Sequence, residues 1–401
     1  MKKPIFYSLP PAGNKIPITA IVKAIRDTRN IYKGGGDSLK DLLGAEYLLY
    51  LTSGRAALWL LLKALSKIKP ARKEIIIPAY TCPAIASAIL KTNLKPVLCD
   101  INLNDFGFKT EDLRLKINKG TLAVVIVHLF GFPANIEEVK ECCKLNDVFL
   151  IEDAAQAFGN SPLGSPESKL GLLGDAGFFS FGRGKPLSLG HGGILVTNSD
   201  GVFAESRKVF ENIKQQNGYS EIRYLFMLGS YSIFSNPHLY WIPQNMPFFH
   251  IGETIFEPGF EISRGIDLAA SLITNFLPSI EKEKEIRQEN TMYYSNGLDG
   301  IPEIKKVPFP EFPYLRYPLI INDSKQRNRV LDQLICHGTG ATLFYPTPLN
   351  ELPGLEEVLG DRNVYPNAKK LSDGLITLPV HSGVTVSHCE KIIEIIKQKL
   401  L

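Results

Sequence analysis

The chain has 401 residues, of which 44% are hydrophobic, 21% charged and 10% aromatic. These are ordinary globular values, and they exclude a disordered, collagen-like or coiled-coil chain. Its 45 basic and 41 acidic side chains leave a net charge of +4, too small an excess to indicate a nucleic-acid partner. The six cysteines form neither a disulfide framework nor a metal-ligand pattern. Lys2 and Lys3 are not followed by the long apolar run of a secretory signal, so we expect none. We therefore expect a cytoplasmic protein that holds no metal.

Apolar runs and amphipathic segments alternate through the first half of the chain. The runs predict strands over 47–52, 74–77, 96–99, 122–128, 148–151, 178–181 and 194–197. The amphipathic segments predict helices over 55–65, 84–90, 110–117 and 135–144. This order predicts an α/β fold, a three-layer sandwich whose mostly parallel sheet has helices on both faces. Ligands of such sheets bind beyond the carboxyl ends of the strands.

The second half has a different pattern. It predicts a helix over 266–290 kinked at Pro278, strands over 317–321 and 341–344, a helix over 324–337, and a C-terminal helix. Ser387 and Glu390 are spaced as a capping box for the last helix. We expect a large domain over 1–260 and a smaller C-terminal α+β domain over 261–401.

The uncharged, apolar segment 224–252 is long enough to span a membrane. Gly229, Pro237, Pro243 and Pro247 interrupt it, however, and a lipid-exposed span needs a continuous helix. We therefore expect a buried insertion, or an apolar surface near a substrate site or subunit contact, rather than membrane association.

Residues 52–55, Thr-Ser-Gly-Arg, join the first strand to a helix. Free amides at a helix start, with no Cβ at Gly54 and a positive charge at Arg55, suit a phosphate group. The alternative is an ordinary serine N-cap.

Two carboxylates, Glu152 and Asp153, end another strand and precede Ala154, Ala155 and Gln156. Buried carboxylates require a partner, and the two alanines leave room for a flat group. The alternative is an aspartate that caps a helix.

Residues 177–186, GFFSFGRGKP, present Lys185 from a glycine turn that follows a buried strand. The segment is not a phosphate-binding P-loop, because Phe179 stands where that motif has glycine and Pro186 follows the lysine. The alternative is a solvated loop lysine. Tyr80, after the strand 74–77, is either a site aromatic or a core tyrosine.

An anion site, a carboxylate after a strand and a glycine-flanked lysine, in this order, fit one cofactor. Pyridoxal 5'-phosphate (PLP) needs a phosphate cup, a carboxylate on its pyridinium nitrogen and a lysine that holds its aldehyde as a Schiff base. The lysine must be able to lose its proton, which a desolvated site favours.

In these residues the chain resembles the DegT/DnrJ/StrS sugar aminotransferases of PLP fold type I. The matching segments are 53–58, 77–89, 95–102, 127–139, 151–159, 174–198 and 378–385. The resemblance implies that Lys185 carries the cofactor, that Asp153 pairs with the pyridinium nitrogen and that Gln156 lies near the ring. It also implies that Gly54, Arg55 and Ser180 hold the phosphate, and that the protein is a homodimer with sites at the subunit interface.

The chain departs from the family pattern at several positions. Arg55 stands where the family usually has threonine, and Cys82 stands where it usually has a ring-stacking aromatic, for which we substitute Tyr80. Residues 261–263, Glu-Ile-Ser, replace a motif whose asparagine normally reaches the partner subunit's phosphate. Residues 344–346, Phe-Tyr-Pro, resemble a family segment near the small domain, with a substrate contact left unassigned.

The resemblance implies transfer of an amino group, with glutamate as the expected donor, to a nucleotide-linked ketosugar of surface-polysaccharide or secondary-metabolite biosynthesis. Three alternatives remain. A PLP-dependent sugar dehydratase would have histidine in place of Lys185. A non-catalytic sensor with this fold is suggested by Arg55, by Cys82 and by the missing asparagine at 261–263. A membrane-surface enzyme acting on a lipid-linked sugar is suggested by segment 224–252 alone.

Overall fold

The computed structural model describes residues 6–27, 35–246 and 253–401. Its larger sheet has seven strands in the order β1-β7-β6-β5-β4-β2-β3. Their bounds are β1 (Tyr47–Leu51), β2 (Glu74–Pro78), β3 (Lys95–Cys99), β4 (Thr121–Val127), β5 (Phe149–Asp153), β6 (Ala176–Ser180) and β7 (Gly193–Thr197). The neighbours from β3 to β6 are parallel, and β7 alone runs antiparallel to both β6 and β1. All seven expected strands, and the mostly parallel sheet, are confirmed.

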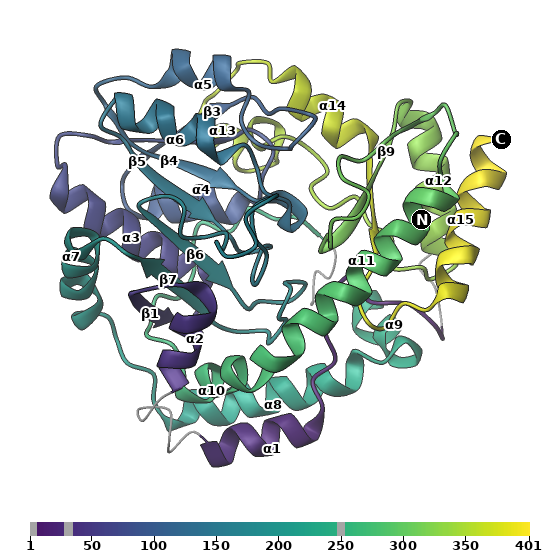
Figure 1. The fold of residues 1–401 in the computed structure, drawn as a ribbon, viewed down its shortest axis with the longest axis horizontal. Helices are drawn as coiled ribbons and strands as arrows, with labels where there is room; N and C mark the ends of the chain where they lie inside the picture. The colour runs from purple at the N-terminus through teal and green to yellow at the C-terminus, as the bar shows by residue number, and fades with distance from the viewer. Residues whose placement is uncertain (1–5, 28–34, 247–252) are drawn as a thin grey trace.

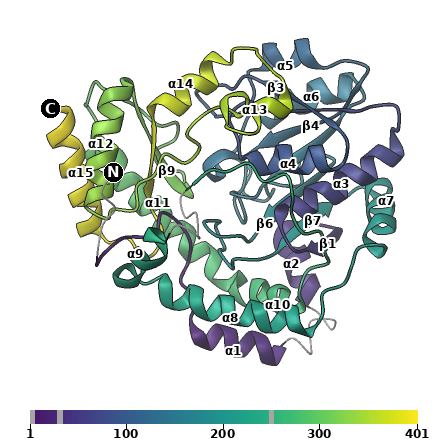
Figure 2. The ribbon, with the colours of Figure 1, turned by 180° about the vertical axis from the view of Figure 1, so that it is seen from behind.

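Helices cover both faces of this sheet, as expected for a three-layer sandwich (Figures 1 and 2). One face carries α3 (Gly54–Ile68), α4 (Pro83–Lys91) and, outside α3, α7 (Asp200–Glu211). The other carries α5 (Thr110–Lys116) and α6 (Ile136–Leu145) at one end, and α1 (Ile18–Asp27), α2 (Gly35–Leu43) and α10 (Asp267–Phe276) at the other. Side chains alternate along β4, where Val125 packs toward α3 and Val124 toward α6.

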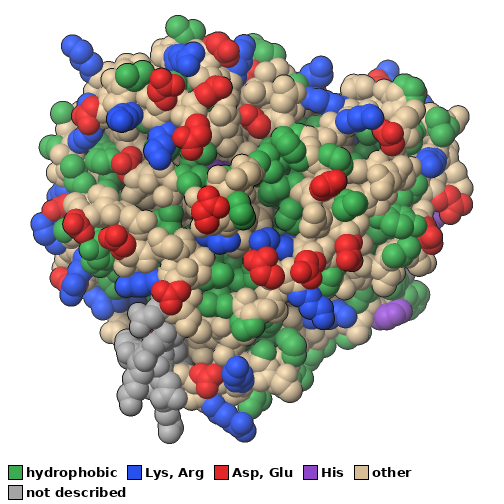
Figure 3. Space-filling view, in the orientation of Figure 1, with side chains coloured by type: hydrophobic (Ala, Val, Ile, Leu, Met, Phe, Trp, Pro, Cys, Tyr) green, Lys and Arg blue, Asp and Glu red, His purple; other side chains and the backbone are tan. Residues whose placement is uncertain are grey.

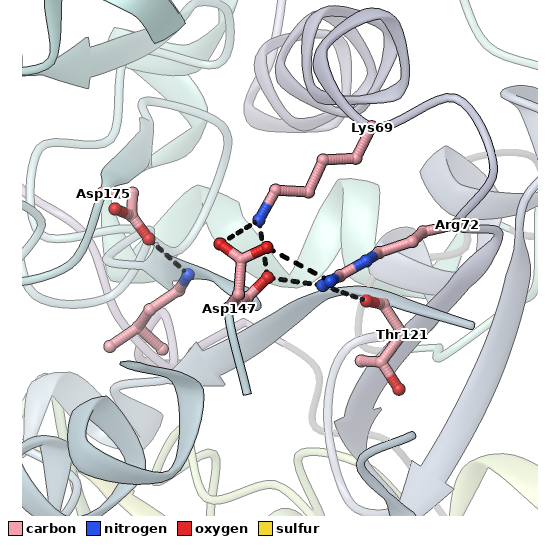
Figure 4. Close-up of polar contacts among 6 residues, drawn as sticks. Lys69, Arg72, Thr121, Asp147 and Asp175 are labelled. Carbon is pink, nitrogen blue, oxygen red and sulfur yellow. Dashed lines mark hydrogen bonds and ion pairs between the residues drawn. The ribbon is translucent and has the colours of Figure 1, made fainter. Parts of the chain in front are cut away.

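An exposed ion cluster joins the turns at the amino ends of the strands, the edge opposite the expected ligand edge (Figure 4). Lys69 Nζ lies 2.6 Å from Asp147 Oδ1, and Arg72 Nη2 lies 3.2 Å from Asp147 Oδ2. Arg72 also donates to the Thr121 carbonyl oxygen at 3.2 Å. Because 77% of the Asp147 side chain is exposed, these ion pairs should contribute little to the free energy of folding. We interpret them as contacts that hold the turns together.

The C-terminal part has its own small sheet and core. The antiparallel sheet has the order β10-β9-β8, with β8 (Ile304–Lys305), β9 (Arg316–Ile321) and β10 (Leu375–Pro379). The helices around it are α12 (Ser324–Cys336), α14 (Pro366–Gly374) and α15 (Val386–Leu400). The short helix α13 (Glu356–Leu359) lies instead against the core of the larger sheet, which Leu355 and Leu359 join. The C-terminal part has a hydrophobic core of its own, whose first residue in the chain is Tyr294. The helix α10 does not belong to it, because its buried side chains pack in the core of the larger sheet. The domain boundary at 260/261 stays a prediction.

The expected kink at Pro278 is confirmed, because a 3₁₀ turn over Leu277–Ser279 separates α10 from α11 (Ile280–Gly297). Two other local predictions were wrong. Residues 341–344 form no strand: Thr342 makes an isolated bridge with Thr377, and Phe344 has a left-handed backbone with φ of 66°. The capping box of α15 uses Thr385 and His388 instead of Ser387 and Glu390. Helix periodicity fixes a cap only to within a few residues.

The uncharged segment lies mainly in α8 (Gly218–Phe234) and α9 (Pro237–Asn245), and its residues 247–252 are outside the described part. Tyr224 and Leu228 of α8 are buried, whereas Phe226 is 79% exposed. Across the described ranges, no helix is both long and apolar enough to cross a bilayer. On the face seen in Figure 3, acidic and basic side chains are interspersed and form no basic stripe.

Candidate active site

The first turn of α3 lies against the carboxyl end of β6. Ser53 caps the helix, since its Oγ accepts a hydrogen bond from the Ala56 amide at 3.2 Å. A Cβ added to Gly54 would lie 2.9 Å from Ser180 Cβ and 3.4 Å from the Phe179 carbonyl oxygen. The chain therefore needs glycine at this point, where the positive end of the helix faces the Ser180 hydroxyl. Gly54 and Ser180 are thus brought together in a cradle of the kind that suits phosphate.

Arg55, the third expected phosphate ligand, is occupied elsewhere. Its Nη1 lies 2.8 Å from Glu257 Oε2, and its guanidinium carbon lies 5.2 Å from the centre of the Phe260 ring. The Phe260 ring also lies 4.5 Å from the Lys91 ammonium. Arg55 would have to leave Glu257 to reach an anion at Gly54.

Asp153 ends β5 and is 6% exposed. Its Oδ1 accepts a hydrogen bond from the Ala155 amide at 2.9 Å. Burial raises the pKa of this carboxyl, and the positive charge of Lys185 opposes that shift. The carboxylate thus gains from a cationic partner, such as a protonated ring nitrogen.

Gln156 lies one turn further on, with 5% of its surface exposed. Its Oε1 accepts a hydrogen bond from the Phe130 amide at 2.9 Å, which fixes the orientation of the side-chain amide. The Nε2 then points to the Tyr345 hydroxyl, 3.5 Å away.

Lys185 stands in the loop between β6 and β7. Among the described residues its ammonium has no hydrogen bond or ion pair, although its charge acts on Asp153. Gly184, before it, has φ of +75°, and a Cβ there would also lie 2.9 Å from Arg316 Nη2. The Ser188 hydroxyl holds the turn by accepting from the Gly184 amide at 2.8 Å. The loop therefore presents an unpaired amine beside a buried carboxylate.

Tyr80 is only 1% exposed and lies beneath Tyr345. Its hydroxyl donates to the Tyr345 carbonyl oxygen at 3.0 Å, and the two ring centres are 5.7 Å apart in an edge-on arrangement. Burial raises the pKa of both phenols, and the Tyr345 hydroxyl lies beside Cys82 and near Asp153. Of the two tyrosines, Tyr345 approaches Asp153 and Gln156. The sequence marked Tyr345 only through the Phe-Tyr-Pro segment at 344–346, and its position beside Asp153 and Gln156 could not be predicted from that segment.

Glu152 points away from Asp153, because adjacent side chains of a strand face opposite sides. It is fully buried and accepts hydrogen bonds from the amides of Gly171, Leu173 and Gly174. His128 Nδ1 accepts from the Ala134 amide, so its Nε2 carries the proton and donates to Glu152 at 2.9 Å. Of the two carboxylates, Glu152 therefore supports the loop after β5, and Asp153 is left for the site.

Arg316, at the start of β9, is a second residue that sequence reasoning missed. Its Nη1 donates to Thr342 Oγ1 at 3.2 Å, and its guanidinium carbon lies 5.2 Å from the Phe344 ring centre. Burial lowers its pKa, and within the described ranges it forms no ion pair. No local pattern marks it, because it reaches the Lys185 loop only through the packing of the small sheet.

The residues present fit PLP. The Gly54–Ser180 cradle would hold its phosphate, Asp153 its ring nitrogen and Lys185 its aldehyde. Two observations carry this fit. The Lys185 ammonium has no partner among the described residues but lies close enough for its charge to act on Asp153, and Gly54 lies so close to Ser180 that no Cβ fits between them.

Comparisons with known proteins agree with this geometry. The DegT/DnrJ/EryC1/StrS aminotransferase family matches residues 36–397. The chain is 25% identical over 361 residues to GDP-perosamine synthase of Vibrio cholerae, covering 89% of this chain and 87% of that protein. It is 26% identical over 352 residues to UDP-2-acetamido-2-deoxy-3-oxo-D-glucuronate aminotransferase of Pseudomonas aeruginosa, covering 86% and 84%.

Solved structures share the fold. Helicobacter pylori PseC, an aminotransferase of pseudoaminic acid biosynthesis, superposes with a TM-score of 0.76 at 19% identity, covering 100% of this chain and 99% of that one. The PLP form of the putative sugar aminotransferase Spr1654 of Streptococcus pneumoniae gives 0.74 at 20% identity, covering 98% and 100%. The expected fold, family, cofactor and enzyme class are confirmed: the chain belongs to the DegT/DnrJ/EryC1/StrS aminotransferase family and is a PLP-dependent transaminase.

Proposed function

We propose that this transaminase takes an amino group from glutamate and transfers it to a nucleotide-linked ketosugar, for a surface polysaccharide or a secondary metabolite. Two relatives at about 25% identity support this proposal. One is named for a GDP-linked sugar, perosamine, and the other for a UDP-linked 3-oxo sugar. The observation that carries the chemistry is that an unpaired Lys185, a buried Asp153 and the Gly54–Ser180 cradle meet at one edge of the sheet.

The chain's residues have distinct roles in this proposal. Gly54 and Ser180 bind the phosphate at the start of α3, and Arg55 joins them if it leaves Glu257. Bound PLP supplies an electron sink for the bond that breaks at the amino carbon. Asp153 keeps the ring nitrogen protonated, and Gln156 orients the ring.

Lys185, once released, moves a proton at the amino carbon as general base and then general acid. Its lack of a competing partner leaves it free for both tasks. Tyr345 lies where it can close the site beside Gln156, and stacking by Tyr80 stays a prediction. We also propose a homodimer with sites at the subunit interface, on the resemblance alone; its mass in solution tests this.

The experiment is a single-turnover panel. Protein saturated with PLP is mixed with glutamate, and loss of the absorbance band of the lysine-bound cofactor is followed. Nucleotide-linked ketosugars are then added, and the one that restores the band identifies the acceptor. Lys185→Ala is the control, because it cannot form the band.

A protein that binds PLP but reacts with no amino donor would refute the proposed transfer and support the sensor alternative. A band that persists in Lys185→Ala would refute the assignment of that residue.

A further inference from the structure

A cavity of about 210 Å³ lies beside the Lys185 loop, and its wall includes Pro186 and Leu187. The apolar part of the wall contains Phe158 and Ile280, which belong to the core on the face of the sheet opposite α3. The cavity is therefore separate from the Gly54–Ser180 cradle, which lies at the start of α3. Its polar part comes from the N-terminal segment and from α11.

Arg287 of α11 lines this cavity, although it is only 4% exposed. Its Nε is buried and has no hydrogen-bond partner in the described part of the chain. Burial lowers its pKa to about 10, so the guanidinium is still charged at neutral pH. A buried charge without a partner is costly, and charged groups in protein interiors are normally paired.

Asn14 supplies a second donor without an acceptor. It is 8% exposed, and its Oδ1 accepts a hydrogen bond from the Ser188 amide at 2.5 Å. Because the oxygen is fixed by that amide, the nitrogen is fixed too, and Nδ2 is buried with no partner among the described residues. Lys15, the next residue, also lines the cavity and brings another positive charge.

The remaining charges leave the cavity positive. Glu283 is the one carboxylate in its lining, one helical turn before Arg287, and no ion pair joins the two within the described ranges. Glu281 is paired with Lys284 at 3.0 Å. Lys15 and Arg287 act electrostatically on His381, but burial lowers the pKa of His381 to about 4, so its ring is neutral at pH 7 and adds no charge. Arg287 and Lys15 thus outweigh Glu283.

We propose that this cavity is an oxyanion site that binds a carboxylate or phosphate group, separate from the cofactor's phosphate cradle. Donors that lack acceptors require a ligand that brings acceptors, and guanidinium with amide suits an oxyanion. The apolar wall can bury the rest of the bound molecule. The group is supplied by the diphosphate of a nucleotide-linked substrate or by the carboxylate of an amino donor. Since Pro186 and Leu187 form part of the wall, a bound anion also steadies the loop that carries Lys185.

Calorimetric titration of the cofactor-saturated protein tests this, because PLP then fills the Gly54–Ser180 cradle. The probes are inorganic pyrophosphate and glutarate at constant ionic strength. Asn14→Asp keeps the acceptor for the Ser188 amide but turns an anionic oxygen into the cavity, and we expect it to weaken binding about tenfold or more. Arg287→Gln should have a similar effect. Lys282→Gln is the matched control, because Lys282 is an exposed charge on the same helix and outside the cavity lining.

Binding of pyrophosphate alone identifies the phosphate source, and binding of glutarate alone identifies the carboxylate source. Binding of neither, or equal binding by wild type and Asn14→Asp, overturns the proposal. So does a crystal soaked in the better probe that holds only water in the cavity. Should Arg287→Gln fail to fold, Asn14→Asp and the crystal still decide. The choice of a nucleotide-linked substrate or an amino donor as the source of the anion rests on the proposed function, whereas the anion site itself rests on Asn14 and Arg287. The two failures are distinguishable, because cofactor loading and reaction with an amino donor are read from the absorbance and anion binding is read from the calorimetry.

Discussion

Gly54→Ala probes the cradle with a single methyl group. The added Cβ would lie 2.9 Å from Ser180 Cβ, closer than side-chain carbons pack, and 3.4 Å from the Phe179 carbonyl oxygen. Neither neighbour can move easily, because both belong to β6, which is hydrogen-bonded to β5 and β7. The strain must therefore be taken up by a shift of the first turn of α3 away from β6, which opens the phosphate cradle.

Two opposing effects set the size of the change. Overpacking a well-packed contact costs about 1–3 kcal/mol. Alanine is better than glycine inside a helix by up to about 1 kcal/mol, and this gain is smaller at the first helical residue. We expect a net loss of about 1–2 kcal/mol in the free energy of unfolding and, from the same shift, about tenfold weaker PLP binding.

The matched control is Gly201→Ala in α7, where an added Cβ meets nothing within 4 Å. It should be neutral or slightly stabilising. The double variant Gly54→Ala with Ser180→Gly removes the Cβ at 2.9 Å and should recover most of the lost stability. Urea unfolding of the four proteins without cofactor gives the stabilities, and equilibrium titration gives the PLP affinity. If Gly54→Ala is as stable as wild type, or if Ser180→Gly does not rescue it, the cradle geometry is refuted.

Three further outcomes are expected. Asp153→Asn keeps the acceptor for the Ala155 amide, so PLP should still bind, but turnover should fall at least about 100-fold; normal turnover would refute its role at the ring nitrogen. Glu152→Ala leaves the buried amides of Gly171 and Gly174 without an acceptor, so it should lower the free energy of unfolding by about 3–5 kcal/mol. Glu152→Gln should lie between Glu152→Ala and wild type, and equal urea midpoints for the three proteins would contradict this. Burial lowers the pKa of His381 to about 4, so its contribution to stability is complete above the unfolded value of 6.5 and is lost as the pH falls toward 4. His381→Gln should therefore lose less stability between pH 7 and 4, by up to about 3 kcal/mol; parallel pH profiles of the two proteins would refute the shift.

The first half of the fold could be predicted from the sequence because its signals are local. Each buried strand is a run of apolar residues, and each covering helix has its own amphipathic period. The failure at 341–344 has a specific cause: Phe344 takes a left-handed backbone, which ends an extended run that composition alone favours. The misplaced cap of α15 arose because Ser387 and Glu390 match the spacing of a capping box, while Thr385 and His388 form the actual one.

The candidate site divides in the same way. Lys185, Asp153 and Gly54 are marked by the short sequences around them, since each follows a strand, and the carboxyl ends of parallel strands meet at one edge. Tertiary structure decided the rest: the pairing of Arg55 with Glu257, the placement of Tyr345 above Tyr80, and the unpartnered donors of Asn14 and Arg287. These depend on contacts between segments far apart in the chain, and no local propensity specifies which distant side chain will fill a given space.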